Sequence, residues 1–89
     1  MQQEINILVI EDDPQAASCL ESTLKLAGYH VWIVNNPQKG LEILHSGTFA
    51  VVITELRSSI MNGIQFIKEA RKISAGTNIL VLTLYSLIN

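Results

Sequence analysis

The chain has 89 residues, a formal net charge of −2 and a single cysteine, Cys19. A chain of this length forms one small domain at most, and one cysteine supplies neither a disulfide nor a cysteine-based zinc site. The lysines and arginines form no basic cluster, so we expect no nucleic-acid partner. No segment approaches the roughly 18 apolar residues of a membrane span, and no signal-peptide pattern is visible. These features favour a cytoplasmic protein with no membrane partner.

Four short apolar runs are spaced along the chain, and segments with helical periodicity lie between them. Runs that are wholly or almost wholly apolar suit strands that are buried on both faces, as in a parallel sheet. The runs cover residues 5–10, 31–34, 50–53 and 79–82. Strands that alternate with helices predict a single α/β domain over residues 1–89, with a parallel sheet and right-handed crossovers.

Each helical segment carries start and stop signals. A capping residue followed by proline is typical of a helix start, and glycine is typical of the position after a helix end. In the first segment, Cys19 lies beside apolar residues, which predicts a packed and inert thiol. The first two segments carry both signals and run from Asp13-Pro14 to Gly28 and from Asn36-Pro37 to Gly47, whereas the third starts after Asn62-Gly63 and closes before Gly76.

Oxygen-bearing side chains stand where three of the predicted strands end. Glu11 and Asp12 follow the first strand, Glu55 ends the third, and Thr83 ends the fourth. Sites in open α/β sheets form at the carboxyl ends of the strands. If the first and third strands are neighbours, their three carboxylates converge on one cleft beside the Thr83 hydroxyl. Carboxylate oxygens are ligands that Mg²⁺ accepts.

This combined pattern resembles the receiver domain of bacterial two-component response regulators, a flavodoxin-like α/β fold, over residues 5 to about 87. In that family an acidic pair follows the first strand, a phosphoacceptor Asp ends the third, and a Ser or Thr ends the fourth. Glu11-Asp12, Glu55 and Thr83 stand at these positions, and residues 55–63 occupy the loop commonly written D-L-x-M-P-x-M-D-G.

The resemblance implies a three-layer fold with strand order 2-1-3-4. It also implies that Glu11, Asp12, Glu55 and the backbone carbonyl of Arg57 bind Mg²⁺. In receivers a histidine kinase supplies the phosphoryl group, and the hydroxyl at the position of Thr83 moves toward that group.

The chain departs from the family pattern at the phosphoacceptor position. Glu55 stands in place of Asp, and its extra methylene moves the carboxylate by roughly an ångström, a misplacement that can cost about 100-fold in an in-line transfer. The sequence also stops at Asn89, before the family's last helix-strand-helix unit and its essential Lys. We therefore expect a truncated, degenerate receiver (a pseudo-receiver) that is not phosphorylated and is not an enzyme. It would bind Mg²⁺ weakly at most and would act by contact with a histidine kinase or another signalling protein.

Two alternatives stay open. The chain could be a Mg²⁺-dependent receiver that still accepts a phosphoryl group on Glu55, or a small metal-dependent phosphatase-like α/β protein. The second is disfavoured because no nucleophile elbow or glycine-rich phosphate loop is visible. Acidic residues also suit a helix N-terminus for purely structural reasons, because the helix dipole favours negative charge there.

The sequence finally favours self-association. Only 16% of the residues are charged, against about 25% in typical domains. In the order 2-1-3-4 the fourth strand, residues 79–83, is an apolar edge with no charge or proline to protect it. We expect a homo-oligomer that forms through this edge or through swapped elements.

Overall fold

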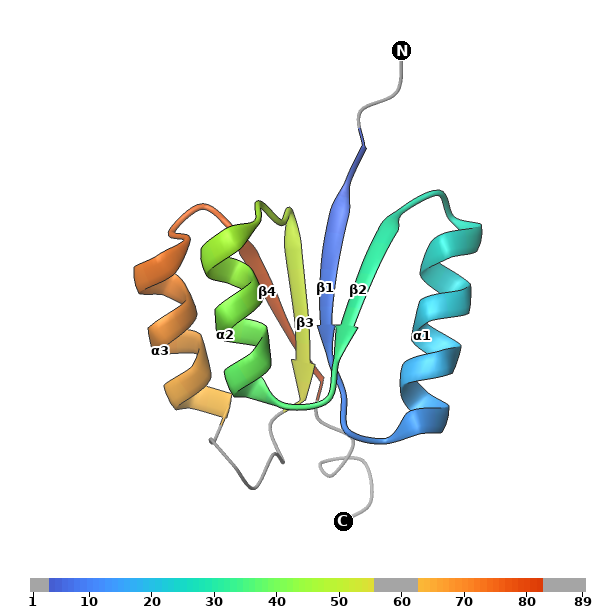
Figure 1. Ribbon diagram of the computed structural model, residues 1–89, viewed down its shortest axis with the longest axis horizontal. Coiled ribbons are helices and arrows are strands. Elements are labelled where there is room, and N and C mark those ends of the chain that lie inside the picture. Colours follow the sequence, from blue (N-terminus) through green and yellow to red (C-terminus); the bar gives the residue numbers. More distant parts are fainter. Residues whose placement is uncertain (1–3, 56–62, 83–89) are drawn as a thin grey trace.

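A four-stranded parallel sheet lies between two layers of helices. The computed structural model describes residues 4–55 and 63–82, and the strand order is β2-β1-β3-β4 (Figure 1). Both the flavodoxin-like architecture and the order 2-1-3-4 are thereby confirmed. Among the described residues, no helix has the length and apolar character to cross a membrane. The elements are β1 (Asn6–Ile10), α1 (Pro14–Leu26), β2 (His30–Val34), α2 (Pro37–Ser46), β3 (Val51–Glu55), α3 (Gly63–Ile73) and β4 (Asn78–Leu82).

The predicted capping residues begin the first two helices. The Asp13 carboxylate accepts a hydrogen bond from the Ala16 N–H at 3.2 Å, and the Asn36 side-chain oxygen accepts one from the Lys39 N–H at 2.9 Å. A proline follows each cap at the first helical position, where its missing N–H costs nothing. Gly28 follows the end of α1 with a φ of 99°, a left-handed conformation that glycine adopts without strain.

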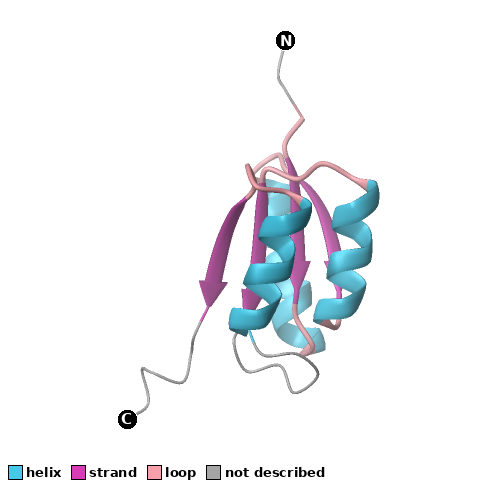
Figure 2. Ribbon diagram, turned by 90° about the vertical axis from the view of Figure 1, so that its left-hand side faces the viewer, coloured by secondary structure: helices cyan, strands magenta, loops and turns pink. Residues whose placement is uncertain are grey.

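The larger part of the core lies between the sheet and the helices α2 and α3. Figure 2 shows these two helices in front of the sheet and α1 behind it. Phe66 of α3 is fully buried there against Leu8 of β1 and Val52 of β3. Burying a phenylalanine side chain contributes about 1.5–3 kcal/mol, so this cluster fixes α3 over the sheet.

Among the residues that the structure describes, α1 is the helix that covers the opposite face of the sheet. Ile7 and Val9 of β1 are buried on this face, with Leu20 and Leu24 of α1 packed against them. No residue of α1 is itself buried. The prediction of a packed Cys19 is wrong, because this thiol is exposed. A helix without a neighbouring helix on its own face buries only a narrow stripe.

Helix α2 lies close against β1 at Gly40. A Cβ atom at this position would lie 2.6 Å from Ile10 Cδ1 and 3.0 Å from Ile10 Cγ1. A side chain at this position would therefore force the Ile10 side chain or α2 itself to move. This contact explains why a poor helix former stands inside a helix.

Candidate functional site

The carboxyl ends of the parallel strands meet at one edge of the sheet. β1 pairs directly with β3, and the register sets Ile10 opposite Thr54. The next residues, Glu11 and Glu55, therefore follow at the same level on neighbouring strands. The expectation that the first and third strands are neighbours, on which the convergence of the carboxylates depended, is confirmed.

Several predicted site groups lie outside the described part of the molecule. They are the side chain of Glu55, the backbone carbonyl of Arg57 and the hydroxyl of Thr83. The backbone of Glu55 ends β3 and pairs with Leu82 of β4, so Thr83 follows β4 directly in the chain. The roles assigned to these three groups stay predictions.

The two acidic residues after β1 have different surroundings. Glu11 is 6% exposed, and its Oε2 accepts a hydrogen bond from the Asp13 N–H at 3.1 Å. Its own N–H donates to the Val34 carbonyl of β2 at 3.0 Å. Asp12, by contrast, is exposed. A buried carboxylate needs such partners to offset its lost hydration, so Glu11 is held in place while Asp12 remains open to solvent.

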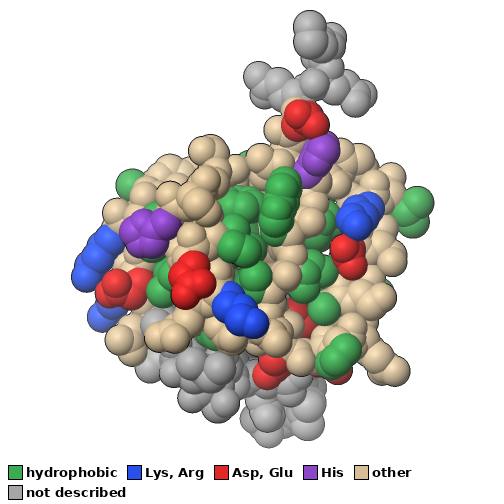
Figure 3. Space-filling view, viewed as in Figure 1, with side chains coloured by type: hydrophobic (Ala, Val, Ile, Leu, Met, Phe, Trp, Pro, Cys, Tyr) green, Lys and Arg blue, Asp and Glu red, His purple; other side chains and the backbone are tan. Residues whose placement is uncertain are grey.

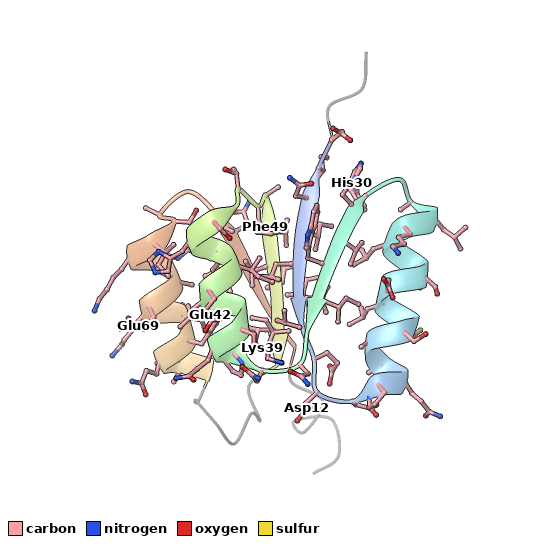
Figure 4. The ribbon with its side chains drawn as sticks, in the orientation of Figure 1. Asp12, His30, Lys39, Glu42, Phe49 and Glu69 are labelled. Atoms are coloured by element: carbon pink, nitrogen blue, oxygen red, sulfur yellow. The ribbon has the colours of Figure 1, made fainter. Side chains whose placement is uncertain are left out.

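A groove of about 460 Å³ lies beside this acidic pair, on the β2 side. Its walls include Ala17 of α1, Ile33 of β2 and Lys39 of α2. Figure 4 labels Asp12 and Lys39, which lie at the same end of the sheet. Lys39 was not among the predicted site residues. The sequence signal that could have pointed to Lys39 was the Asn36-Pro37 helix start, because it places the first turn of α2 at the carboxyl edge of the sheet.

The side-chain oxygen atoms at the acidic edge supply only some of the ligands that a hard cation such as Mg²⁺ needs. Glu11 and Asp12 offer carboxylate oxygens, the ligand type that Mg²⁺ prefers. Among the residues that the structure describes, no group of three His, Cys, Asp or Glu side chains is placed to hold a metal ion. A third protein carboxylate would have to come from Glu55.

A second surface feature lies at the opposite, amino end of the sheet. Trp32 of β2 is 42% exposed and meets Phe49 edge to face, with ring centroids 5.5 Å apart. His30 stacks on Trp32, and its Nε2 lies 2.8 Å from Glu4 Oε1. In Figure 3, hydrophobic side chains reach the surface between α2 and β2. This aromatic group is remote from the acidic edge and takes no part in that site.

Comparison with known proteins assigns the chain to one family. The model of the response regulator receiver domain matches residues 7–89. Transcriptional regulatory protein ZraR of Escherichia coli (strain K12) is 32% identical over 82 residues, which are 92% of this chain and 19% of that protein. The chain thus spans about a fifth of the length of the curated relatives that it first matches.

Solved structures agree in fold over almost the whole chain. The response regulator TrrA of Thermotoga maritima in complex with Mg(2+)-BeF has 29% identity and a TM-score of 0.86, covering 93% of this chain and 72% of that one. TrrA in complex with the histidine kinase ThkA matches with 28% identity and a TM-score of 0.84, covering 91% and 70%.

A response regulator of Burkholderia pseudomallei with a phosphorylated aspartic acid, a calcium ion and citrate has 28% identity and a TM-score of 0.83, covering 90% of this chain and 47% of that one. Receiver domains are signalling modules of two-component systems rather than enzymes. Since the receiver model matches residues 7–89, this chain belongs to the response regulator receiver domain family.

Proposed function

We propose that this chain is a degenerate receiver that binds a signalling protein and does not accept a phosphoryl group. The observation that carries the proposal is the residue at the end of β3, where Glu55 stands next to the end of β1. The family resemblance places the phosphoacceptor aspartate there. The longer glutamate displaces the nucleophilic oxygen by roughly an ångström, and a misplacement of that size can cost about 100-fold in rate.

The similar structures support the kind of partner. TrrA is solved with the histidine kinase ThkA, and its likeness to this chain extends over most of the described fold. A histidine kinase, or another protein that binds the same receiver fold, is therefore the partner class that we propose. The regulator from Burkholderia carries its phosphoryl group on an aspartic acid, the residue type that Glu55 replaces here.

We propose only weak Mg²⁺ binding at the acidic edge. Glu11 and Asp12 would hold the ion together with Glu55 and the Arg57 carbonyl, and the cation would neutralise the crowded carboxylates. Asp12 is exposed and Glu11 is buried, so the solvent-facing ligand is Asp12. Replacing Asp12 with Asn should weaken the binding of Mg²⁺, measured by NMR titration of the amide signals around residues 11–13.

Asp13→Asn provides the matched control for this titration. It removes the same charge from the neighbouring position, while asparagine caps a helix as well as aspartate does. Equal loss of Mg²⁺ affinity in the two variants would show that only the overall charge matters and that no specific site exists.

The central test uses acetyl phosphate and Mg²⁺ with the 89-residue chain. Intact-mass spectrometry should show no stoichiometric phosphoryl adduct. Glu55→Gln serves as the blank, because it keeps the side-chain length and removes the nucleophilic carboxylate. An adduct that maps to Glu55 and is absent from Glu55→Gln would overturn the proposal in favour of a Mg²⁺-dependent phosphorylated receiver.

The proposal also includes self-association. Only 16% of the residues are charged, and Leu80 of the edge strand β4 is 55% exposed. In the described part of the chain β4 is an edge of the sheet, and apolar surface at a sheet edge favours pairing with another chain.

A further inference from the structure

The aromatic group at the amino end of the sheet borders a small surface hollow. Trp32, the only tryptophan of the chain, is 42% exposed. Its ring meets the buried Phe49 ring edge to face, and both rings line a hollow of about 390 Å³. A volume of this size suits one small group, because ligand sites in proteins measure about 300–1,000 Å³. The other residues that line the hollow come from β1 and from the end of α2 onward: Asn6, Ile43, Ser46, Gly47 and Thr48.

The end of helix α2 gives this hollow a negative electrostatic potential. The last turn of a helix leaves carbonyl groups without partners inside the helix, and the helix dipole places about half a negative charge there. Helix α2 ends at Ser46 with Gly47 as its cap, and both residues line the hollow. The lysine of this helix, Lys39, lies in its first turn, at the opposite end of the sheet. The hollow therefore offers carbonyl oxygens to a positively charged hydrogen-bond donor.

Two carboxylates add to this potential. Glu42 lies one helical turn before Ser46 and is exposed on α2 (Figure 4). Glu4 Oε1 lies 2.8 Å from Nε2 of His30, whose ring stacks on Trp32. In the part of the chain that the structure describes, no lysine or arginine lines the hollow. Figure 3 shows acidic side chains beside the hydrophobic surface between α2 and β2. The charges around the hollow thus complement a cationic group.

The exposed tryptophan ring favours one kind of cation. An aromatic face attracts a cation, and tryptophan does so more strongly than tyrosine or phenylalanine. A guanidinium group is planar and weakly hydrated, so it stacks on an aromatic ring better than a lysine ammonium group does. Its five N–H groups also donate hydrogen bonds in several directions. An arginine side chain can therefore use the ring and the carbonyl oxygens of the hollow at the same time.

We propose that this hollow binds an arginine side chain from an exposed segment of a partner protein. The guanidinium group lies against the Trp32 ring and donates hydrogen bonds to the carbonyl oxygens at the end of α2. The partner then contacts the amino end of the sheet and leaves the acidic edge free. The inference rests on the proposed function only in that the partner is a protein. It is tested without Mg²⁺ or a phosphoryl donor, so either claim can fail without the other.

The fluorescence of Trp32 tests whether the ring is accessible in solution. Because the chain has a single tryptophan, the signal reports on this position alone. Acrylamide should quench the fluorescence of the folded chain readily. A ring that acrylamide does not quench would be covered in solution, and this result would overturn the proposal.

Peptide titrations followed by NMR test the binding of arginine. The probe is the tripeptide glycyl-arginyl-glycine with both ends blocked, used at pH 8, where ordinary histidine side chains are uncharged. It should shift the Trp32 indole N–H signal and the amide signals of Gly47 and Thr48 in a saturable way. The same peptide with citrulline, which keeps the shape but has no charge, should bind about 5- to 30-fold more weakly. Equal affinities for the two peptides, or tighter binding of an acidic peptide, would overturn the proposal.

Two substitutions locate the binding site. Trp32→Leu keeps an apolar side chain but removes the aromatic face, and it should weaken arginine binding about 5- to 30-fold, measured from the amide signals of Gly47 and Thr48. Glu42→Gln should weaken it about 2-fold. Circular dichroism verifies that each variant is folded.

Glu21→Gln is the matched control for Glu42→Gln. It removes the same charge from α1, on the opposite face of the sheet, and should leave arginine binding unchanged. This pair of variants decides the question even if Trp32→Leu does not fold. Full affinity in a folded Trp32→Leu variant, or equal losses in Glu42→Gln and Glu21→Gln, would contradict the proposed site.

Discussion

The contact between Gly40 and Ile10 allows a quantitative test of how α2 is seated on β1. Replacing Gly40 with Ala places a Cβ atom 2.6 Å from Ile10 Cδ1, whereas carbon atoms pack at about 3.5–4.0 Å. Overpacking of this kind costs about 1–3 kcal/mol, and alanine in a helix interior recovers about 1 kcal/mol relative to glycine. We expect Gly40→Ala to lower the free energy of unfolding by about 1 kcal/mol in net terms.

A double-mutant cycle assigns this loss to the contact itself. Ile10→Val removes Cδ1 and alone costs about 0.5–1.5 kcal/mol. In the double variant the new Cβ atom meets Cγ1 at 3.0 Å instead of Cδ1 at 2.6 Å. The two substitutions together should therefore cost less than the sum of their separate effects, by about 0.5–1 kcal/mol.

Urea unfolding followed by circular dichroism measures all members of the cycle. Gly76→Ala is the control, because a Cβ atom there has no neighbour within 4 Å, and it should change stability by less than about 0.5 kcal/mol. Additive losses in the cycle, or a Gly40→Ala variant as stable as Gly76→Ala, would refute the packing argument. Ile10 immediately precedes Glu11, so this contact lies next to the acidic edge.

Two further predictions concern the core and the helix caps. Phe66→Ala should lower the free energy of unfolding by about 3–5 kcal/mol, because Phe66 is fully buried between α3 and the sheet; a loss below 1 kcal/mol in urea unfolding would contradict the described core. Asp13→Ala and Asn36→Ala should each cost about 1 kcal/mol through loss of a cap, whereas Asp13→Asn should be close to neutral in the same assay.

Much of the fold could be predicted because its signals are local. The four apolar runs became the four strands, and the caps at Asp13 and Asn36 began α1 and α2 as expected. The strand order also followed, since the family resemblance supplied a topology that apolar runs alone do not fix. Parallel strands then brought Glu11 and Glu55 to one level.

What the sequence did not predict depends on long-range packing. The apolar residues around Cys19 indicated a buried thiol, yet α1, the one helix on its face of the sheet in the described part of the chain, leaves Cys19 exposed. Lys39 lies beside the acidic pair only because α2 begins at the same edge as α1. The reason for Gly40 likewise appears only once α2 and β1 are seen in contact.

The central claim is that the length of the Glu55 side chain prevents phosphoryl transfer. The most direct measurement compares the wild-type chain with Glu55→Asp in acetyl phosphate and Mg²⁺, with labelling followed over time on Phos-tag gels. We expect the aspartate variant to be labelled about 100-fold faster than the wild-type chain. Equal labelling rates for glutamate and aspartate at this position would contradict it.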